Sequence, residues 1–170
     1  RFEDISDLSP VTLPTSPGVN PAGIALDSSG KIHVMCMNRF LLRWDNILGE
    51  NALVYEFSGN VMDVGRAIAL DSQDRIYVTS TNNIKQIIRI DNMNGDNLTV
   101  LDNDGHFENL TGIAVDSLGR IHVADVNNQC LWRFDDMTGA NPLCFYNAAY
   151  GGFMEPSGIR VDSNDRVYFS

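Results

Sequence analysis

Residues 111–142 read TGIAVDSLGRIHVADVNNQCLWRFDDMTGANP and carry the clearest structural signal in this chain. The stretch holds three short runs rich in apolar, β-branched and aromatic residues, at 112–115, 121–124 and 130–134. Gly, Asn and Asp separate these runs. Runs of this length between such residues are typical of antiparallel strands joined by tight connections. We therefore expect neighbouring antiparallel strands here.

The same pattern recurs along the chain at nearly constant spacing. An Ile-x-x-Asp-Ser motif places its Asp at 27, 71, 116 and 162, in steps of 44, 45 and 46 residues. A second motif, Arg-x-Asp with an aromatic residue or Ile between, follows at 43–45, 89–91 and 133–135. Self-similarity at this period with several short strands per unit predicts the blades of a β-propeller.

On these motifs the chain resembles the NHL-repeat family of propellers. The resemblance rests on residues 112–125, 127–128 and 131–135, and residues 151–158 fit the family's connection between blades. It covers essentially the whole chain and implies an all-β fold of four-stranded antiparallel blades around a central channel. It implies no single activity, because relatives include peptide, protein and RNA binders and a few lyases and hydrolases.

The repeats divide the chain into units at 21–64, 65–110 and 111–156, with an incomplete unit at 157–170. Residues 1–20 are expected to end a preceding blade, because Arg1-Phe2-Glu3-Asp4 resembles the Arg-x-Asp motif. Two explanations stay open: an excerpt of a larger propeller, which we favour, or ends that meet in one split blade within a chain or between copies. Each unit starts with a small residue that lets inner strands approach closely: Gly23, Ala67, Gly112 and Gly158.

The charge balance argues against polyanionic partners. The chain of 170 residues has 12 Lys and Arg against 22 Asp and Glu, a net charge of -10. Nucleic acids and anionic membrane surfaces are bound by clustered basic residues, which the sequence lacks. No apolar run approaches the length of a membrane span. We expect neither nucleic-acid binding nor membrane insertion.

The three cysteines leave at least one unpaired within the chain. Cys130 and Cys144 flank a turn between two expected strands, so they can lie opposite each other near disulfide distance. Two small buried thiols are the alternative, and we favour them. Cys36 is expected to be a lone thiol in the core.

Several polar patterns look functional but recur in every repeat. Asp27, Asp71, Asp116 and Asp162 are each followed four residues later by Lys or Arg, which predicts structural turns rather than catalysis. His33, Tyr77, His122 and Tyr168 share one position of the second strand, where an amphipathic ring packs. Residues 102–108 only partly resemble a calcium loop. We expect an ordinary blade connection there, with Phe107 and Phe153 as plugs, and keep calcium as an alternative.

Variation between repeats is the better guide to a binding surface, because loops on a rigid scaffold often carry function. The connections between second and third strands differ most, at 37–39, 80–86 and 125–129. The candidate surface residues are Arg66, Lys85, Asp125, Asn128 and Arg160. No metal ligand set is predicted. Asn20, Glu108, Asn109 and Asp125 are the residue types that hold calcium in propeller lactonases, without a matching pattern.

Taken together, the sequence predicts a non-enzymatic propeller that binds protein, peptide or glycan, with no cofactor. One alternative is a metal-dependent propeller enzyme of the lyase or lactonase type. Another is a structural subunit of a larger extracellular assembly or filament, with self-association between copies. Acidity, repeat type and scarce lysine suggest an extracellular or periplasmic location.

Overall fold

The computed structural model of the chain describes residues 20–145 and 155–170. Its strands form antiparallel sheets in which sequence neighbours pair. The first sheet contains β1 (Pro21–Leu26), β2 (Ile32–Cys36), β3 (Phe40–Trp44) and β4 (Leu53–Glu56). The second contains β5 (Val64–Leu70), β6 (Ile76–Thr81), β7 (Gln86–Ile90) and β8 (Thr99–Leu101). The third contains β9 (Leu110–Val115), β10 (Ile121–Asp125), β11 (Cys130–Phe134) and β12 (Leu143–Phe145). The last described sheet pairs β13 (Ile159–Val161) with β14 (Val167–Phe169).

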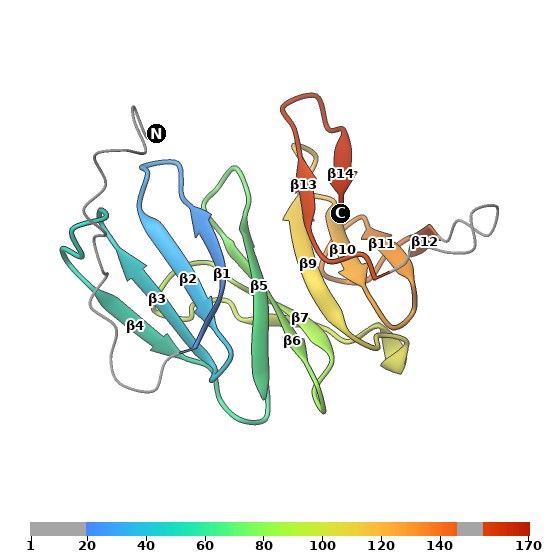
Figure 1. Cartoon of the computed structure of the whole chain (residues 1–170), viewed down its shortest axis with the longest axis horizontal. Helices are drawn as coiled ribbons and strands as arrows, with labels where there is room; N and C mark the ends of the chain where they lie inside the picture. Colours follow the sequence, from blue (N-terminus) through green and yellow to red (C-terminus); the bar gives the residue numbers. More distant parts are fainter. Residues whose placement is uncertain (1–19, 146–154) are drawn as a thin grey trace.

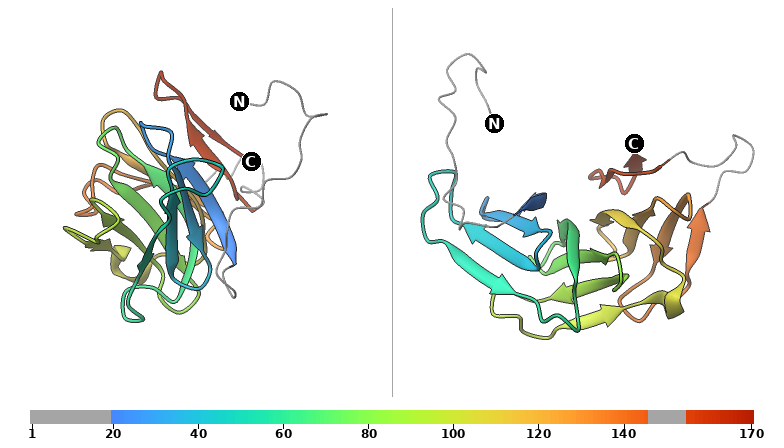
Figure 2. Two further views of the ribbon diagram at one scale, coloured as in Figure 1. Left: turned by 90° about the vertical axis from the view of Figure 1, so that its left-hand side faces the viewer. Right: turned by 60° about the horizontal axis from the view of Figure 1, so that its bottom comes forward.

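The sheets stand side by side in an arc, as Figures 1 and 2 show. The first strand of each sheet lies on the concave side, and β5 packs against both β1 and β9. The concave strands approach closely because they carry small residues. A Cβ added at Gly112 would lie 2.7 Å from the carbonyl oxygen of Ser157, and one at Gly23 would lie 3.0 Å from that of Arg66. The all-β propeller prediction is confirmed.

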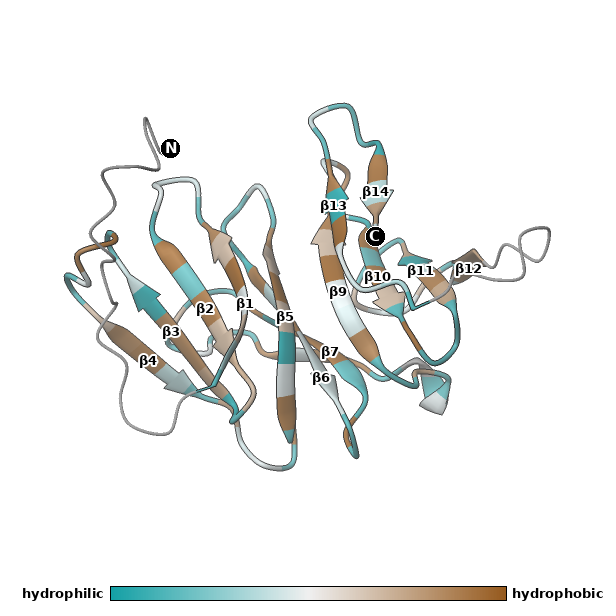
Figure 3. Cartoon of the chain, viewed as in Figure 1, coloured by the Kyte–Doolittle hydropathy of each residue, from teal (hydrophilic) through white to brown (hydrophobic). Residues whose placement is uncertain are grey.

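The hydrophobic cores lie between neighbouring sheets. Every residue of β6 and of β10 is buried, because each strand has a neighbouring sheet on both faces. Figure 3 shows hydrophobic segments along the strands of every sheet. Burying one Leu, Ile or Phe side chain contributes about 1.5–3 kcal/mol, so sheet stacking supplies most of the stability. Phe107 is 1% exposed and packs edge-on against Phe134, as expected for a plug.

A three-residue 3-10 turn, η2 (Asn103–Gly105), lies in the 102–108 connection. No helix within the described ranges is long and apolar enough to cross a membrane. The expected final strand of a preceding blade at 1–19 and the expected plug Phe153 lie outside the described residues.

The cysteines correct one expectation. The sequence favoured two separate buried thiols at Cys130 and Cys144, but the structure joins them in a disulfide and leaves Cys144 exposed. Cys144 pairs in register with Trp132, so it lies diagonally across the β11–β12 ladder from Cys130, with Cα atoms 5.8 Å apart. That distance is within the usual disulfide range. Cys36 is a buried free thiol.

Candidate binding face

The concave face is built from the edges of sheets. β1, β5 and β9 are each the terminal strand of their sheet, and β13 is one edge of its own. An edge strand presents main-chain N–H and C=O groups that can pair with another extended segment. The concave face therefore offers main-chain hydrogen-bonding groups as well as side chains.

Two adjoining pockets lie along this face. The larger, 370 Å³ in volume, is lined mainly by apolar residues of β1, β5, β9 and β13. The smaller, 160 Å³, lies against the small residues at the starts of the same strands. Ile24, Ile68, Ile113 and Arg160 line both pockets, so the two are continuous. The larger volume falls within the roughly 300–1,000 Å³ of small-ligand sites.

Arg66 on β5 and Arg160 on β13 both line the smaller pocket and are exposed. The repeats hold uncharged residues at the equivalent positions: Ala22, Thr111 and Ser157 for Arg66, and Ala25, Ala69 and Ala114 for Arg160. Each arginine is thus a departure from the repeat at a position that lines the concave face.

These two arginines also differ from the other basic residues in their partners. Every other Lys or Arg of the described ranges has a carboxylate oxygen within 4.0 Å. No carboxylate of the described ranges pairs with Arg66 or Arg160. Nη1 of Arg160 donates to the carbonyl oxygen of Ile159 at 2.9 Å. In a chain of net charge -10, one pocket thus holds two exposed guanidinium groups that no carboxylate of the described ranges neutralises.

The other three predicted surface residues form a second group: Lys85 and Asn128 lie in the connections after β6 and β10, and Asp125 ends β10. Lys85 donates to Glu108 at 2.7 Å on the surface. Asp125 is 0% exposed, so its carboxylate does not reach solvent. Asn128 donates to Asp125 at 2.8 Å and to the carbonyl oxygen of His106 at 2.7 Å. The structure therefore separates Arg66 and Arg160 from the remaining candidates.

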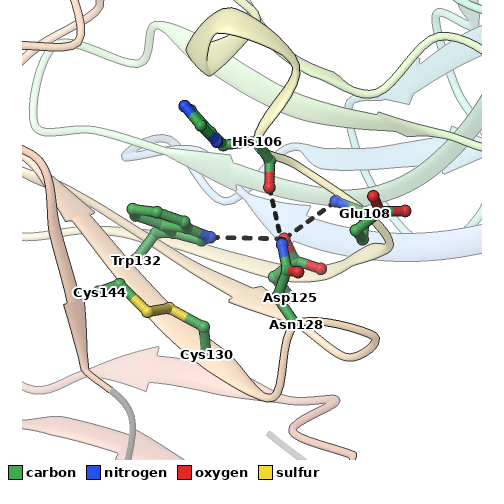
Figure 4. Close-up of a disulfide and its surroundings, with 7 residues drawn as sticks. All are labelled: His106, Glu108, Asp125, Asn128, Cys130, Trp132 and Cys144. Atoms are coloured by element: carbon green, nitrogen blue, oxygen red, sulfur yellow. Dashed lines mark hydrogen bonds between the residues drawn. A yellow bond between two sulfur atoms is a disulfide. The ribbon is translucent and has the colours of Figure 1, made fainter.

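Asp125 organises the loop that precedes β9, as Figure 4 shows. Its carboxylate accepts backbone N–H bonds from Glu108 at 3.1 Å and Asn109 at 2.8 Å. Trp132 Nε1 donates to it at 3.4 Å, in addition to the Asn128 bond. A buried carboxylate with this many donors is satisfied. Asp125 can serve a binding surface by holding this loop in place, not by touching a ligand.

The repeated Asp turns are structural in the way the sequence predicts. In each, one carboxylate oxygen accepts the backbone N–H groups two and four residues later. Arg75, Arg120 and Arg166 donate to the second oxygen through Nε. Lys31 departs from this pattern and lies 3.7 Å from Asp45.

Sequence reasoning missed the fourth partner of these turns. The ring of the second strand, six residues after each Asp, reaches the same carboxylate: Tyr77 to Asp71 at 3.1 Å, and His122 Nε2 to Asp116 at 2.9 Å. The shared ring position was visible in the sequence, and the constant six-residue spacing was the signal. Burial raises the pKa of Asp71, but the hydrogen bonds from Arg75 and from backbone N–H groups outweigh it, so this pKa lies below the usual value.

His33 occupies the same ring position beside Asp27, with Nε2 3.2 Å from Oδ2. Burial lowers the pKa of His33 below its usual value, although Asp27 opposes this effect. Within the described ranges no group of three or more His, Cys, Asp or Glu residues could hold a metal ion.

The sequence at 107–134 matches the NHL repeat. No curated protein matches the chain. Among solved structures, the virginiamycin B lyase from Staphylococcus aureus, a catalytically inactive variant crystallised with quinupristin, superposes with a TM-score of 0.73 at 20% identity. That match covers 94% of this chain and 51% of the lyase. The chain thus spans about half the length of the lyase it matches.

Two further structures have the same fold. A protein named as a gluconolactonase gives a TM-score of 0.67 at 15% identity, covering 88% of this chain and 57% of that chain. A chain of the nidogen/laminin complex gives a TM-score of 0.65 at 16% identity, covering 91% of this chain and 73% of that chain. At these identities the likeness concerns the fold alone.

Proposed function

Because the chain carries an NHL repeat within a β-propeller fold, we propose that it is a non-enzymatic binding module that receives a protein or peptide partner on its concave face. The observation that carries the proposal is the placement of Arg66 and Arg160. They are the basic residues of the described ranges without a carboxylate partner, and both line the same pocket.

The physical reason is that two guanidinium groups without carboxylate partners create a local positive potential beside an apolar surface. Nine other basic residues of residues 20–145 and 155–170 are neutralised by neighbouring carboxylates. A partner that brings an anionic group and apolar side chains satisfies both features of the concave face at once. A chain of the nidogen/laminin complex shares this fold, which supports a role in protein interaction.

An extracellular or periplasmic location fits this proposal. Disulfides persist in oxidising compartments and are rare in reducing ones. The bond between Cys130 and Cys144 supports such a location.

Affinity capture with three immobilised proteins tests the binding role: the wild type, Arg66→Gln/Arg160→Gln, and the control Arg39→Gln. Arg39 pairs with Glu56 at 3.2 Å and does not line either pocket, so its replacement changes charge without touching the concave face. A partner held by the wild type and the control but lost by the double variant supports the proposal. Equal retention on all three proteins places binding elsewhere and contradicts it.

The fold likeness to a lyase and to a protein named as a gluconolactonase favours a second candidate, a metal-dependent enzyme. Elemental analysis of the purified chain separates the two proposals. One equivalent of calcium or zinc that survives dialysis supports the enzyme. Absence of any tightly held metal, together with Arg-dependent capture, supports the binding module.

A further inference from the structure

We propose that the concave face binds the free C-terminus of a peptide whose last residues are apolar. The inference rests on the proposed binding function and names the chemistry of the partner. Arg66 and Arg160 receive the terminal carboxylate, and the larger pocket receives the apolar side chains next to it.

The smaller pocket suits a carboxylate rather than a bulky group. Its volume is 160 Å³, and Gly23, Ala67, Gly112 and Gly158 line it, so main chain rather than side chain forms much of its wall. A guanidinium group presents donors in a planar fork that matches the two oxygens of a carboxylate. Nη1 of Arg160 donates to the Ile159 carbonyl oxygen, which orients the guanidinium. Its other donors remain for a ligand.

The larger pocket supplies the apolar contact directly beside the charge. Ile24 is 58% exposed and Leu26 is 62% exposed, although both lie on a strand that faces the pocket. Covering them removes apolar surface from water, which favours binding. Arg160 lines both pockets, so the anionic group and the apolar side chains of a ligand must be close to each other. An apolar C-terminal residue has this arrangement.

The strand edges favour a peptide over other amphipathic anions. β1, β5, β9 and β13 each lie at an edge of their sheet. An extended peptide can exchange main-chain hydrogen bonds with such edges, whereas the alkyl chain of a fatty acid cannot. The net charge of -10 opposes ligands with many negative groups, so one terminal carboxylate is the favoured charge.

A library of random hexapeptides, biotinylated at the N-terminus, provides the probe. One half carries free C-termini and the other half carries C-terminal amides of the same sequences. We expect the wild-type chain to retain free-acid peptides with apolar final residues. The amide of the same sequence should be retained at least about tenfold less, because it cannot form the charge-assisted bidentate contact. Arg66→Gln and Arg160→Gln should each lower retention by a similar factor, and Arg39→Gln should leave it unchanged.

The outcomes separate this inference from the proposed function. Equal retention of acids and amides, or retention that ignores both arginines, overturns the terminal-carboxylate site. Arginine-dependent binding of decanoate without any peptide enrichment overturns the peptide as occupant. If affinity capture still depends on Arg66 and Arg160 while the library gives no enrichment, the C-terminal peptide is wrong and the binding function stands. Circular dichroism melting curves that match the wild type show that each variant is folded.

Discussion

Ser28 and Asp74 join two neighbouring blades through both oxygens of one carboxylate. The Ser28 backbone N–H donates to Oδ1 at 2.8 Å, and its hydroxyl donates to Oδ2 at 2.6 Å. Ser117 and Asp165 repeat this arrangement with the same two distances. Each pair links the Asp turn of one repeat to the turn of the next repeat.

Replacing Asp74 with glycine should lower the free energy of unfolding by about 1 kcal/mol, because two hydrogen bonds between blades are lost at a solvated site. Asp74 has φ 59°, and the equivalent residue of two other repeats is Gly30 or Gly119, so glycine fits this backbone. The change thus removes the carboxylate without forcing a new backbone conformation. Urea unfolding measures the effect. Replacement of the exposed Gln73 by Ala serves as the control, and equal stability of Asp74→Gly and wild type would show that the link contributes nothing.

The boundary between the second and third repeats lacks this link and can receive it. By repeat position, Ser72 faces Gly119, which has no side chain. A Cβ at Gly119 meets nothing within 4 Å, and its φ of 81° is one that Asp tolerates better than most residues. Gly119→Asp should therefore raise the free energy of unfolding by roughly 0.5–1 kcal/mol. Gly119→Ala, which has the strain without the carboxylate, should lower it. A rise with both variants would show that backbone entropy alone is responsible.

The repeat motifs predicted the strands well because their signal is local. Ile113 and Val123 stand in register, as alternating runs on either side of a turn require. β5 begins at Val64, before the motif Ile at position 68, and its pairing with β6 continues across an irregularity between Gly65 and Ile68. Such a bulge leaves no clear mark in one sequence.

The candidate site was only partly predictable, for a physical reason. The sequence named Arg66 and Arg160 only among five candidate surface residues, and the structure shows that these two line one pocket. Lys85 was a candidate surface residue, but Glu108, 23 residues away, pairs with it. The burial of Asp125 likewise depends on partners from the loop before β9. Partners at this sequence separation cannot be inferred from local pattern.

His33→Tyr should remove a loss of stability on mild acidification. Tyr occupies the equivalent position in two other repeats and donates to the turn carboxylate there. Because the folded-state pKa of His33 is lowered, the unfolded chain binds the proton more readily. The stability that the neutral His33 ring contributes is complete above the pKa of His33 in the unfolded chain, about 6.5, and is lost as the pH falls below that value. Urea midpoints at pH 7.5 and pH 5.5 should differ more for the wild type than for the variant. If the midpoint difference between the two pH values is the same for wild type and variant, His33 is not the cause of the acid-induced loss of stability.

Asp125→Asn should cost about 2–4 kcal/mol in the free energy of unfolding. The amide group keeps the shape but turns one acceptor into a donor that faces other donors at a buried site. The hydrogen bonds affected are those that the Asp125 carboxylate accepts from the backbone N–H groups of Glu108 and Asn109. Lys85→Gln is the matched comparison, because it removes a surface ion pair and should cost less than about 1 kcal/mol. Similar losses for both variants would mean that the Asp125 carboxylate is not a buried anchor.

Cys144→Ser should lower the free energy of unfolding by about 2–3 kcal/mol, because the bond to Cys130 closes a short loop in the unfolded chain. Wild type treated with dithiothreitol should match the variant, which separates loss of the bond from loss of the side chain.

Thiol titration gives an independent check of the disulfide. The native chain should show no rapidly reacting thiol, because Cys36 is buried and burial raises the pKa of its thiol. The denatured chain should show one. Three thiols in the denatured, unreduced chain would contradict the disulfide.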